Sequence, residues 1–184
     1  WLGAAQAEAF CPAPSGLGTA QVRQVIDGDT LRLQDGRSVR LIGINAPEIG
    51  RQGRGDEPYA VAARRRLQAL VDDSDGLVGL QLGRESQDRY QRTLAHVYGR
   101  GGLNFEAQLL AEGLALQVAV APNVEQVACQ QQAARAARKA GLGLWRQSPA
   151  IAAAQVERAG FALLGGRVRN VQRNRARACI QQDD

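Results

Sequence analysis

Two aspartates, Asp27 and Asp29, flank a single glycine in the stretch VIDGDT. Paired carboxylates can ligate a hard cation through oxygen, and the glycine lets the backbone turn so that both side chains approach one point. An Asp-Gly pair is also a common turn sequence, so this stretch alone leaves open a simple turn and a metal site. No spacing of His and Cys residues suggests zinc.

A single arginine lies within the apolar stretch RSVRLIGI, residues 37–44, which we expect to form a strand. Alternation would place Arg40 on the same face as Ile42 and Ile44. Such an arginine either reaches for solvent at the rim of the sheet or is held in place for function. The next turn, Asn45-Ala46-Pro47-Glu48, presents the carboxylate of Glu48, although a lone glutamate in a loop is usually only solvated.

A second arginine begins a later strand, in DRYQRTLAHVY, residues 88–98. Asp88-Arg89-Tyr90 is expected to form a turn, and Arg92 to start the strand. Arg40 and Arg92, from separate strands and with carboxylates near both, would form a site for a phosphodiester, because arginine binds two phosphate oxygens at once. A metal ion there would neutralise charge and polarise the phosphoryl group. His96, the only histidine, is expected to be packed or on the surface rather than catalytic.

The elements that must position these residues follow from periodicity and turn signals. Strands are expected over 20–26, 31–34, 37–44, 77–83 and 92–98, with Asp35-Gly36 as a hairpin turn and a shorter strand-like piece over 115–120. Helices are expected over 58–73, 104–113 and 123–141, the last with Asn123 and Gln126 as a capping box. This order predicts an α+β, mainly β fold: a five-stranded oligonucleotide/oligosaccharide-binding (OB) barrel with about three helices.

Composition bounds the class of protein. The chain has 184 residues, which suits one domain with modest extensions. Its formal net charge is +5, and all basic residues but Lys139 are arginine. This weakly favours a polyanionic partner, although an arginine-rich genome would give the same composition. No apolar run is long enough to span a membrane, so no membrane partner is expected.

The motifs VIDGDT, RLIGINAPE, DRYQRTLAHVY and GLGLW together resemble the staphylococcal nuclease (thermonuclease) family, in the family's order, over about residues 20–146. The resemblance implies a calcium-dependent phosphodiesterase on an OB barrel that cuts DNA and RNA and leaves 3′-phosphate ends. Single-stranded DNA and RNA are the expected partners, Ca²⁺ the expected cofactor, and the chain is expected to be a monomer.

The resemblance also implies roles for individual residues. Asp29 looks like the calcium-binding aspartate, and Asp27 like its acidic neighbour outside the ligand set. Arg40 and Arg92 look like the phosphate-binding arginines, and Glu48 like the general base for water. Tyr90, with Arg89 beside it, resembles the edge of the nucleotide pocket.

Two departures from the family pattern affect these roles. The staphylococcal enzyme has Asp-Thr before its Pro-Glu, whereas this chain has Asn45-Ala46. Asn45 offers an amide oxygen and Ala46 a backbone carbonyl, so calcium binding is expected to be weaker because one negative charge is missing. The other pocket tyrosines of the family fall near Val118 and Val120, which removes base stacking.

The three regions of the chain are expected to differ in role. Residues 1–18 would hold a signal-peptide remnant and an N-terminal segment, although an ordinary alanine-rich N-terminus is the alternative. Residues 19–147 would be the nuclease-like barrel. Residues 148–184 would be an arginine-rich extension, with a short helix over 148–160 and then either an edge β-ribbon or a solvated tail.

Export to the periplasm or the medium would allow two of the three cysteines to pair. We expect a disulfide between Cys11 and Cys129, which leaves Cys179 unpaired or paired between chains. Two other readings of the whole chain stay open. One is a catalytically weak or inactive nucleic-acid-binding module on the same barrel, and the other is a binder of something other than nucleic acid.

Overall fold

The structure is a computed structural model that describes residues 10–50, 53, 55–152, 162–166, 168–174 and 177–182. The chain divides into two compact units, residues 1–146 and residues 147–184. Residues 1–9, on which half of the expected signal-peptide remnant and N-terminal segment falls, lie outside the described part.

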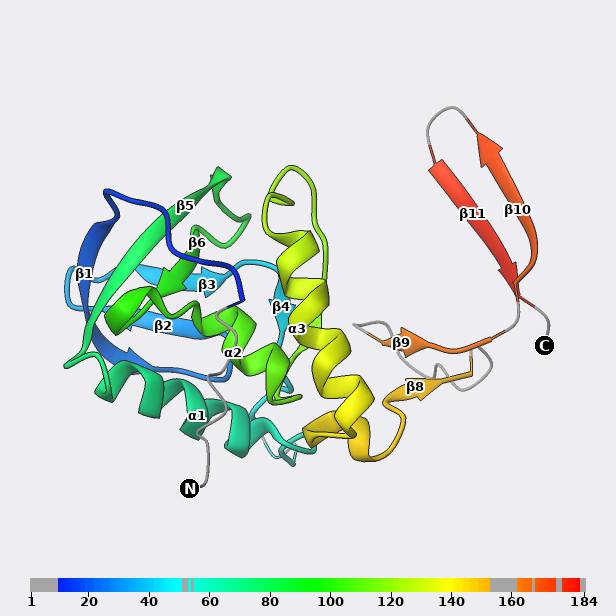
Figure 1. Ribbon diagram of the computed structural model, residues 1–184, viewed down its shortest axis with the longest axis horizontal. Coiled ribbons are helices and arrows are strands. Elements are labelled where there is room, and N and C mark those ends of the chain that lie inside the picture. The colour runs from blue at the N-terminus through cyan, green and yellow to red at the C-terminus, as the bar shows by residue number, and fades with distance from the viewer. Residues whose placement is uncertain are drawn as a thin grey trace, which may run out of the picture. The chain divides into compact units, whose positions relative to one another are not determined.

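The first unit is built on a closed barrel with the strand order β1-β2-β3-β6-β5 (Figure 1). Its strands are β1 (Gly18–Val25), β2 (Thr30–Leu33), β3 (Ser38–Leu41), β5 (Leu77–Gln87) and β6 (Thr93–Tyr98). Adjacent pairs are antiparallel except β3 and β6, which run parallel. The predicted five-stranded barrel is confirmed, and so is the hairpin turn at Asp35-Gly36.

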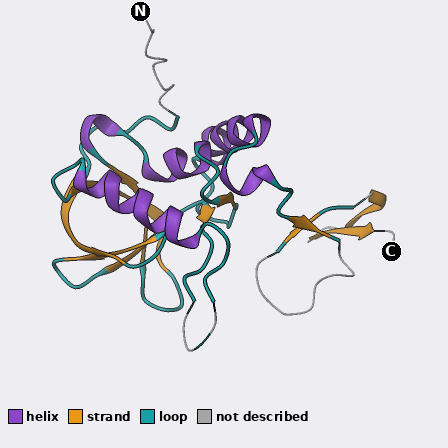
Figure 2. Cartoon of the chain, turned by 90° about the horizontal axis from the view of Figure 1, so that it is seen from below, coloured by secondary structure: helices purple, strands orange, loops and turns teal. Residues whose placement is uncertain are grey.

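The described part of the chain has three α-helices beside the barrel strands. Helices are purple in Figure 2. They are α1 (Ala60–Asp72), α2 (Phe105–Ala111) and α3 (Val127–Ala140), with 3₁₀ turns η1 (Arg100–Gly102) and η2 (Gly143–Arg146). The apolar stripe expected for the first helix is confirmed, because the buried residues of α1 are Ala60, Ala63, Leu67, Leu70 and Val71. α2 packs against both α1 and α3.

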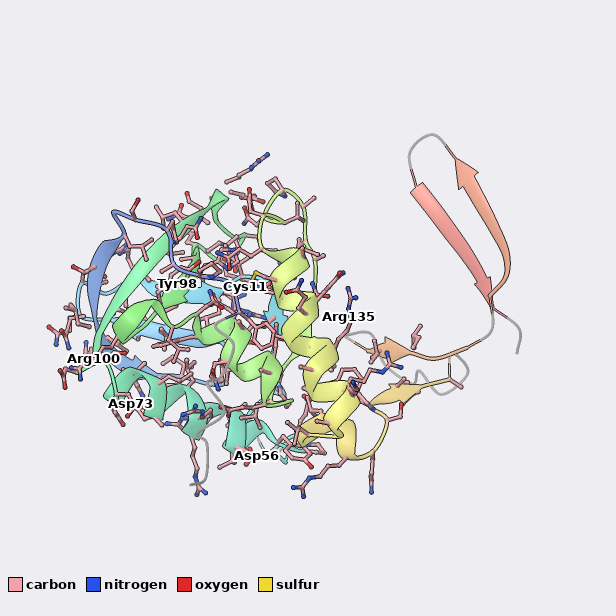
Figure 3. The ribbon with its side chains drawn as sticks, viewed as in Figure 1. Cys11, Asp56, Asp73, Tyr98, Arg100 and Arg135 are labelled. Atoms are coloured by element: carbon pink, nitrogen blue, oxygen red, sulfur yellow. A yellow bond between two sulfur atoms is a disulfide. The ribbon has the colours of Figure 1, made fainter. Side chains whose placement is uncertain are left out.

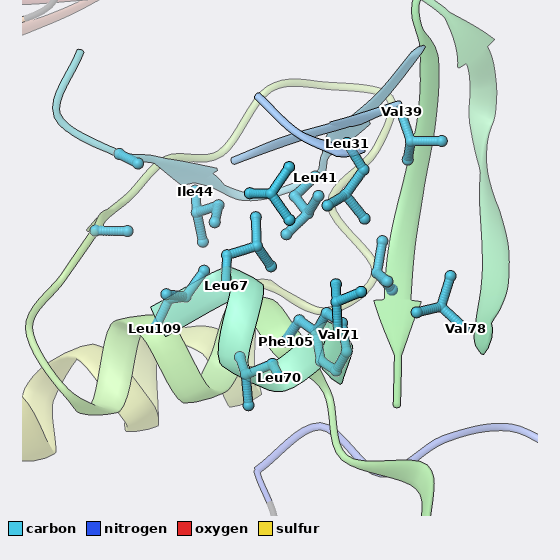
Figure 4. Close-up of a cluster of buried hydrophobic side chains, with 14 of the residues drawn as sticks. Leu31, Val39, Leu41, Ile44, Leu67, Leu70, Val71, Val78, Phe105 and Leu109 are labelled. Carbon is cyan, nitrogen blue, oxygen red and sulfur yellow. The ribbon is translucent and has the colours of Figure 1, made fainter. Parts of the chain in front are cut away.

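The core lies between the barrel and these helices (Figure 4). Leu31 and Leu41 from the strands face Leu67 from α1, and Phe105 and Leu109 from α2 complete the cluster; all five are almost fully buried. Burying a side chain of this size contributes about 1.5–3 kcal/mol, so the packing of α1 on the strands fixes the position of the turns at their ends.

The strand expected over residues 37–44 is wrong in its second half. β3 ends at Leu41, Gly43 has a positive φ of 84°, and Ile44 begins a separate short strand, β4 (Ile44–Asn45), which pairs with β7 (Leu116–Gln117). Ile44 therefore joins Leu41 in the core instead of sharing a face with Arg40. The Gln130 side chain fills the space that a Cβ at position 43 would need and donates to the Ile42 carbonyl at 2.9 Å.

The predicted start of the third helix is also wrong. α3 begins at Val127 with Gln126 as N-cap and no side-chain cap, so Asn123 and Gln126 form no capping box. The helix carries Cys129, which forms a disulfide with Cys11 (Figure 3). These are the two cysteines expected to pair, and the bond joins the segment before β1 to α3.

The second unit, residues 147–184, contains four short strands within its described residues. They are β8 (Ala150–Ile151), β9 (Leu163–Leu164), β10 (Val168–Asn174) and β11 (Arg177–Gln182). β8 pairs with β9 in parallel, and β10 pairs with β11 in an antiparallel hairpin. The short helix expected over 148–160 is therefore wrong at Ala150–Ile151, and its remainder from residue 153 lies outside the described residues.

No helix in the described part of the chain has both the length and the apolar character that crossing a membrane requires.

Candidate functional site

The Asp27-Gly28-Asp29 turn connects β1 to β2 and lies against two other segments. Asp27 Oδ1 accepts a hydrogen bond from the Asp29 N–H at 3.1 Å. A Cβ at position 28 would lie 2.6 Å from the Ala46 Cβ and 2.7 Å from the Ala63 Cβ. Glycine is therefore required for close packing, since any side chain would push the turn away from α1 and from the Asn45-Ala46 loop.

Asp29 is buried and accepts hydrogen bonds on both carboxylate oxygens. Oδ2 accepts from the Ala46 N–H at 2.8 Å, and Oδ1 from the Thr30 hydroxyl at 3.1 Å. Loss of water raises the pKa of the Asp29 carboxyl to about 6, because its desolvation outweighs the attraction of the Arg40 guanidinium; the nearby Asp27 adds to the rise. Further positive charge beside Asp29 would therefore stabilise its ionised carboxylate.

Arg40 is held rather than turned toward solvent. Its Nη1 donates to the carbonyls of Leu41 and Ile44 at 2.9 and 3.0 Å. Its Nη2 donates to Asn45 Oδ1 at 3.2 Å and lies 3.1 Å from Asp29 Oδ2. The Arg40 side chain is only 17% exposed. This guanidinium joins the aspartate turn, the end of β3 and the Asn45 side chain into one cluster.

Arg92 is oriented by the turn between β5 and β6. Asp88 Oδ2 accepts from Arg92 Nε at 2.7 Å, and Asp88 Oδ1 accepts from the N–H groups of Tyr90 and Arg92 at 2.9 Å each. Partial burial would raise the pKa of the Asp88 carboxyl, but these donors and the Arg92 charge lower it below its usual value. The predicted turn at Asp88-Arg89-Tyr90 is therefore built around the Asp88 side chain.

Tyr90 projects from this turn and is 64% exposed. The guanidinium of Arg89 lies 4.7 Å from the centre of its ring, and that of Arg92 lies 5.6 Å from it. An exposed aromatic ring flanked by two cations suits contact with a flat, electron-rich group that carries a negative charge.

Arg40 and Arg92 line the same pocket, of about 530 Å³. The parallel register explains this, because Arg40 pairs with Leu94 and Arg92 lies two residues before Leu94, on the same face of the sheet. The pocket is lined by Arg40, Leu41, Ile42, Gly43, Ile44, Glu85, Asp88, Arg89, Tyr90, Arg92, Leu94, Val118, Val120, Ala121 and Asn123. The pocket thus combines apolar side chains with three arginines, two acidic residues, Asn123 and Tyr90.

Sequence reasoning missed the residue that holds one wall of this pocket. The Asn123 side chain accepts from the Glu85 N–H at 3.0 Å and donates to the Glu85 carbonyl at 2.8 Å. It thereby ties the segment that carries Val118 and Val120 to the end of β5. Nothing local in the sequence links positions 85 and 123, and the Asn123 spacing to Gln126 pointed instead to a helix cap.

Glu48 is exposed and is not among the residues that line the pocket. Its backbone is held by Glu57: Oε2 of Glu57 accepts from the Glu48 N–H at 2.9 Å, and the Glu57 N–H donates to the Glu48 carbonyl at 3.0 Å. Asp56 similarly accepts from the Gly50 N–H at 2.8 Å. The two acidic residues at the end of this loop were also missed, although their position just before Pro58 marks the loop's end.

His96 is buried beside Glu106, with Nδ1 and Oε1 3.6 Å apart. Neither ring nitrogen has a hydrogen-bond partner among the described residues. His96 does not line the pocket, which agrees with the expectation of a packed rather than catalytic histidine.

Comparisons with known proteins show which family the chain belongs to. A family profile described as "Staphylococcal nuclease homologue" matches residues 38–147, a range that includes Arg40, Glu48 and Arg92. The chain belongs to the staphylococcal nuclease family. A thermonuclease of Staphylococcus intermedius is 36% identical over 129 residues, which cover 68% of this chain and 75% of the relative.

Two further relatives extend the comparison. A thermonuclease of Staphylococcus hyicus is 32% identical over 130 residues, covering 69% of this chain and 75% of the relative. An uncharacterised endonuclease of Haemophilus influenzae is 31% identical over 144 residues, covering 76% and 73%. The chain thus spans about three quarters of the length of each of these three relatives.

In this staphylococcal nuclease homologue, every ligand predicted from the sequence for the aspartate turn would bind a metal through oxygen. The predicted ligands are the Asp29 carboxylate, the Asn45 amide oxygen and the Ala46 carbonyl, with Asp27 predicted to lie outside the ligand set. No cluster of three or more His, Cys, Asp or Glu residues suited to a metal ion occurs within the described ranges. The donors fit a hard cation that binds oxygen, with less negative charge than a site built from three carboxylates.

Proposed function

We propose that this chain is a calcium-dependent nuclease that hydrolyses phosphodiester bonds in single-stranded DNA and RNA and leaves 3′-phosphate ends. The main observation behind this proposal is that Arg40 takes part in both the oxygen cluster and the pocket. Its guanidinium contacts the oxygen cluster at Asp29 and Asn45, and the same side chain lines the pocket that holds Arg92. A phosphate in contact with both arginines would lie next to the oxygen cluster.

Asp29, Asn45 and the Ala46 carbonyl would hold the calcium ion, with Asp27 close by. A bound calcium ion would neutralise negative charge and polarise the phosphoryl group. The raised pKa of Asp29 supports this assignment, because it marks a buried carboxylate whose charge is incompletely compensated within the protein.

Other residues of the chain would bind the phosphate, position the attacking water and contact the nucleotide. Arg40 and Arg92 would donate hydrogen bonds to the non-bridging oxygens and stabilise the charge that builds on them during an in-line displacement. Glu48 would orient a water molecule or accept its proton. Tyr90 and the apolar pocket would contact the nucleotide, with Val118 and Val120 giving apolar contact in place of stacking.

The proposed enzyme acts as a monomer in the periplasm or the medium. The Cys11–Cys129 disulfide supports an oxidising compartment, where such bonds persist. Thiol alkylation of the protein as isolated from cell fractions would test this, since the exported form should leave Cys11 and Cys129 unmodified.

The experiment that tests the function is cleavage of single-stranded DNA across a calcium titration. Arg92→Ala should lower kcat by about 10²–10³-fold with a smaller change in KM, since the lost donors act on charge that develops in the reaction. Glu48→Gln should lower kcat by about 10²–10⁴-fold. Arg64→Ala, on the exposed side of α1, is the matched control and should leave both constants unchanged.

The products and the metal give two further checks. Polymerase extension of the cleaved strands should fail until a phosphatase removes a 3′-phosphate. Chelation of calcium should abolish cleavage and added calcium should restore it. Unchanged turnover in Arg92→Ala would reject its role.

A second candidate function is a catalytically weak or inactive nucleic-acid-binding module. The neutral Asn45, whose amide oxygen is already engaged by Arg40 at 3.2 Å, favours it. A parent protein that binds single-stranded DNA but does not cut it at millimolar calcium would establish this reading instead.

A further inference from the structure

The positive charge of the chain is concentrated near its C-terminus. Residues 158–182 contain six arginines and no acidic residue, whereas residues 1–146 contain 17 basic and 15 acidic residues. A stretch with six arginines and no acidic residue carries a net positive charge, which favours a polyanionic partner. The sequence alone left open whether this stretch is a solvated tail or a β-ribbon.

The structure gives this stretch a regular backbone. β10 and β11 form a two-stranded antiparallel sheet that pairs with no other strand in the described part of the chain. The register pairs Arg173 with Ala178 and Asn174 with Arg177, and Arg169 lies at the register shift between Val168 and Asn170. The hairpin therefore spaces three arginines along a ribbon instead of leaving them on a random coil.

Phosphate is the anion that best suits this arrangement. Arginine presents a planar fork of donors that binds two phosphate oxygens at once, and every basic residue of the hairpin is an arginine. The remaining residues of β10 include Asn170, Gln172 and Asn174, whose amides also hydrogen-bond to phosphates and sugars.

We propose that the β10–β11 hairpin is a second nucleic-acid-binding site, which binds the phosphate backbone through Arg169, Arg173 and Arg177. Nucleic acid is chosen over other polyanions because of the proposed function of the first unit, although binding itself needs no catalysis. Because both units belong to one chain, a polynucleotide held by the hairpin is at a raised effective concentration for the pocket. A dinucleotide is too short to gain from this.

The test compares the full-length protein with two triple variants that remove the same charge. Arg169→Gln, Arg173→Gln and Arg177→Gln are combined in the hairpin variant. The matched control combines Arg23→Gln, Arg64→Gln and Arg65→Gln, which are exposed positions of the first unit. Binding of a long single-stranded oligodeoxynucleotide is measured in EDTA by fluorescence anisotropy over a salt series.

The hairpin variant should weaken binding by about 10-fold or more and reduce the slope of log K against log salt by about 2, since each phosphate contact contributes about 0.7 for a single strand. Replacing the same three residues with lysine should restore the slope, because the charge is kept. In calcium, KM for the long substrate should rise while the constants for a dinucleotide stay unchanged, which also shows that the first unit is folded.

Three results would overturn the proposal. One is that the hairpin variant binds the oligodeoxynucleotide with the affinity and salt dependence of the parent. Another is that the control variant loses as much affinity as the hairpin variant. The third is that the hairpin is needed for binding to phosphatidylglycerol vesicles and not for binding to DNA.

The proposed nuclease function is tested separately. A parent protein that binds DNA through the hairpin but cuts neither substrate would support the second site and reject the nuclease function. Normal cleavage that the hairpin substitutions do not affect would support the nuclease function and reject the second site.

Discussion

Arg40 and Asp29 form a buried ion pair, with Nη2 and Oδ2 3.1 Å apart, yet the pKa of Asp29 is raised to about 6. The two facts are compatible because the Arg40 guanidinium also binds the Leu41 and Ile44 carbonyls and Asn45. Its charge is shared among several oxygens, while Asp29 loses most of its water. The pair therefore fixes the geometry of the aspartate turn more than it stabilises the ionised carboxylate.

The first prediction concerns the pH dependence of stability without calcium. The pKa of Asp29 is about 6 in the folded protein and 3.8 in an unperturbed aspartate, so the folded state binds the proton more tightly than the unfolded state. The free energy of unfolding should therefore fall as pH rises from about 4 to about 6, and this contribution of the protonated carboxyl is lost above that range. The full change is about 3 kcal/mol. Urea unfolding in EDTA should show that Asp29→Asn removes this fall and is the more stable protein at pH 8.

The control for this prediction is Asp88→Asn. The pKa of Asp88 is lowered, so its contribution is present above the usual pKa and is lost as pH falls through the lower folded value. Asp88→Asn should therefore destabilise the protein at pH 8, in the opposite direction to Asp29→Asn. If Asp29→Asn is the less stable protein at pH 8, the buried carboxylate is better compensated than its surroundings indicate.

A second prediction adds charge to the oxygen cluster. Asn45→Asp should tighten calcium binding by about 10-fold, since affinity rises with the number of charged ligands. Its new carboxylate would also face Arg40 Nη2, now 3.2 Å from the amide oxygen. Calorimetric titration of calcium gives the affinity. Asn45→Ala, which removes the oxygen, should weaken binding, and equal affinities in the three proteins would remove residue 45 from the ligand set.

A third prediction concerns the loop that carries Glu48. Glu57→Ala removes the acceptor of the Glu48 N–H and should lower kcat by about 10-fold with little change in KM, because Glu48 is then less well positioned. Glu57→Gln keeps an acceptor and should recover most of the activity. Asp56→Ala is the matched control, since Asp56 binds Gly50 instead. An equal loss in Asp56→Ala would mean that the whole loop, and not Glu48, was disturbed.

A fourth prediction concerns the pocket wall held by Asn123. Asn123→Ala removes both hydrogen bonds to the Glu85 backbone and should lower the free energy of unfolding by about 1–3 kcal/mol. KM for the oligonucleotide should rise, because Val118 and Val120 are no longer fixed. Asn104→Ala removes the cap of α2, which binds the Ala107 N–H at 2.7 Å, and should cost about 1 kcal/mol without changing KM.

The sequence predicted those parts of the fold that depend on local pattern. The apolar residues from Ala60 to Val71 recur with helical spacing, and the residues on either side of Asp35-Gly36 alternate as in strands joined by a hairpin turn. In each case the spacing of the apolar residues predicts which side chains are buried. The motifs also placed Arg40 and Arg92 on separate strands. Their presence in one pocket required the parallel pairing of β3 with β6, which joins residues 54 positions apart in the sequence, such as Arg40 and Leu94.

The sequence could not predict contacts that join distant segments through single side chains. Gln130 fills the space beside Gly43, which has a positive φ just beyond the end of β3, and Asn123 binds the backbone of Glu85. In both cases the residue types are ordinary polar residues of helices and loops. Their positions are decided by tertiary packing, which overrides the local signals at Ile44 and at the expected start of α3.

The Cys11–Cys129 disulfide spans 118 positions of the sequence, and the whole barrel, α1, α2 and the proposed catalytic residues lie between its ends. A protease that cuts one peptide bond anywhere in this interval would leave both fragments covalently attached. A nicked molecule would still migrate as a single species without reductant, because the disulfide would hold the two fragments together. Release of the fragments would require both the backbone cut and reduction of the disulfide. A single backbone cut therefore does not by itself separate the chain into two molecules.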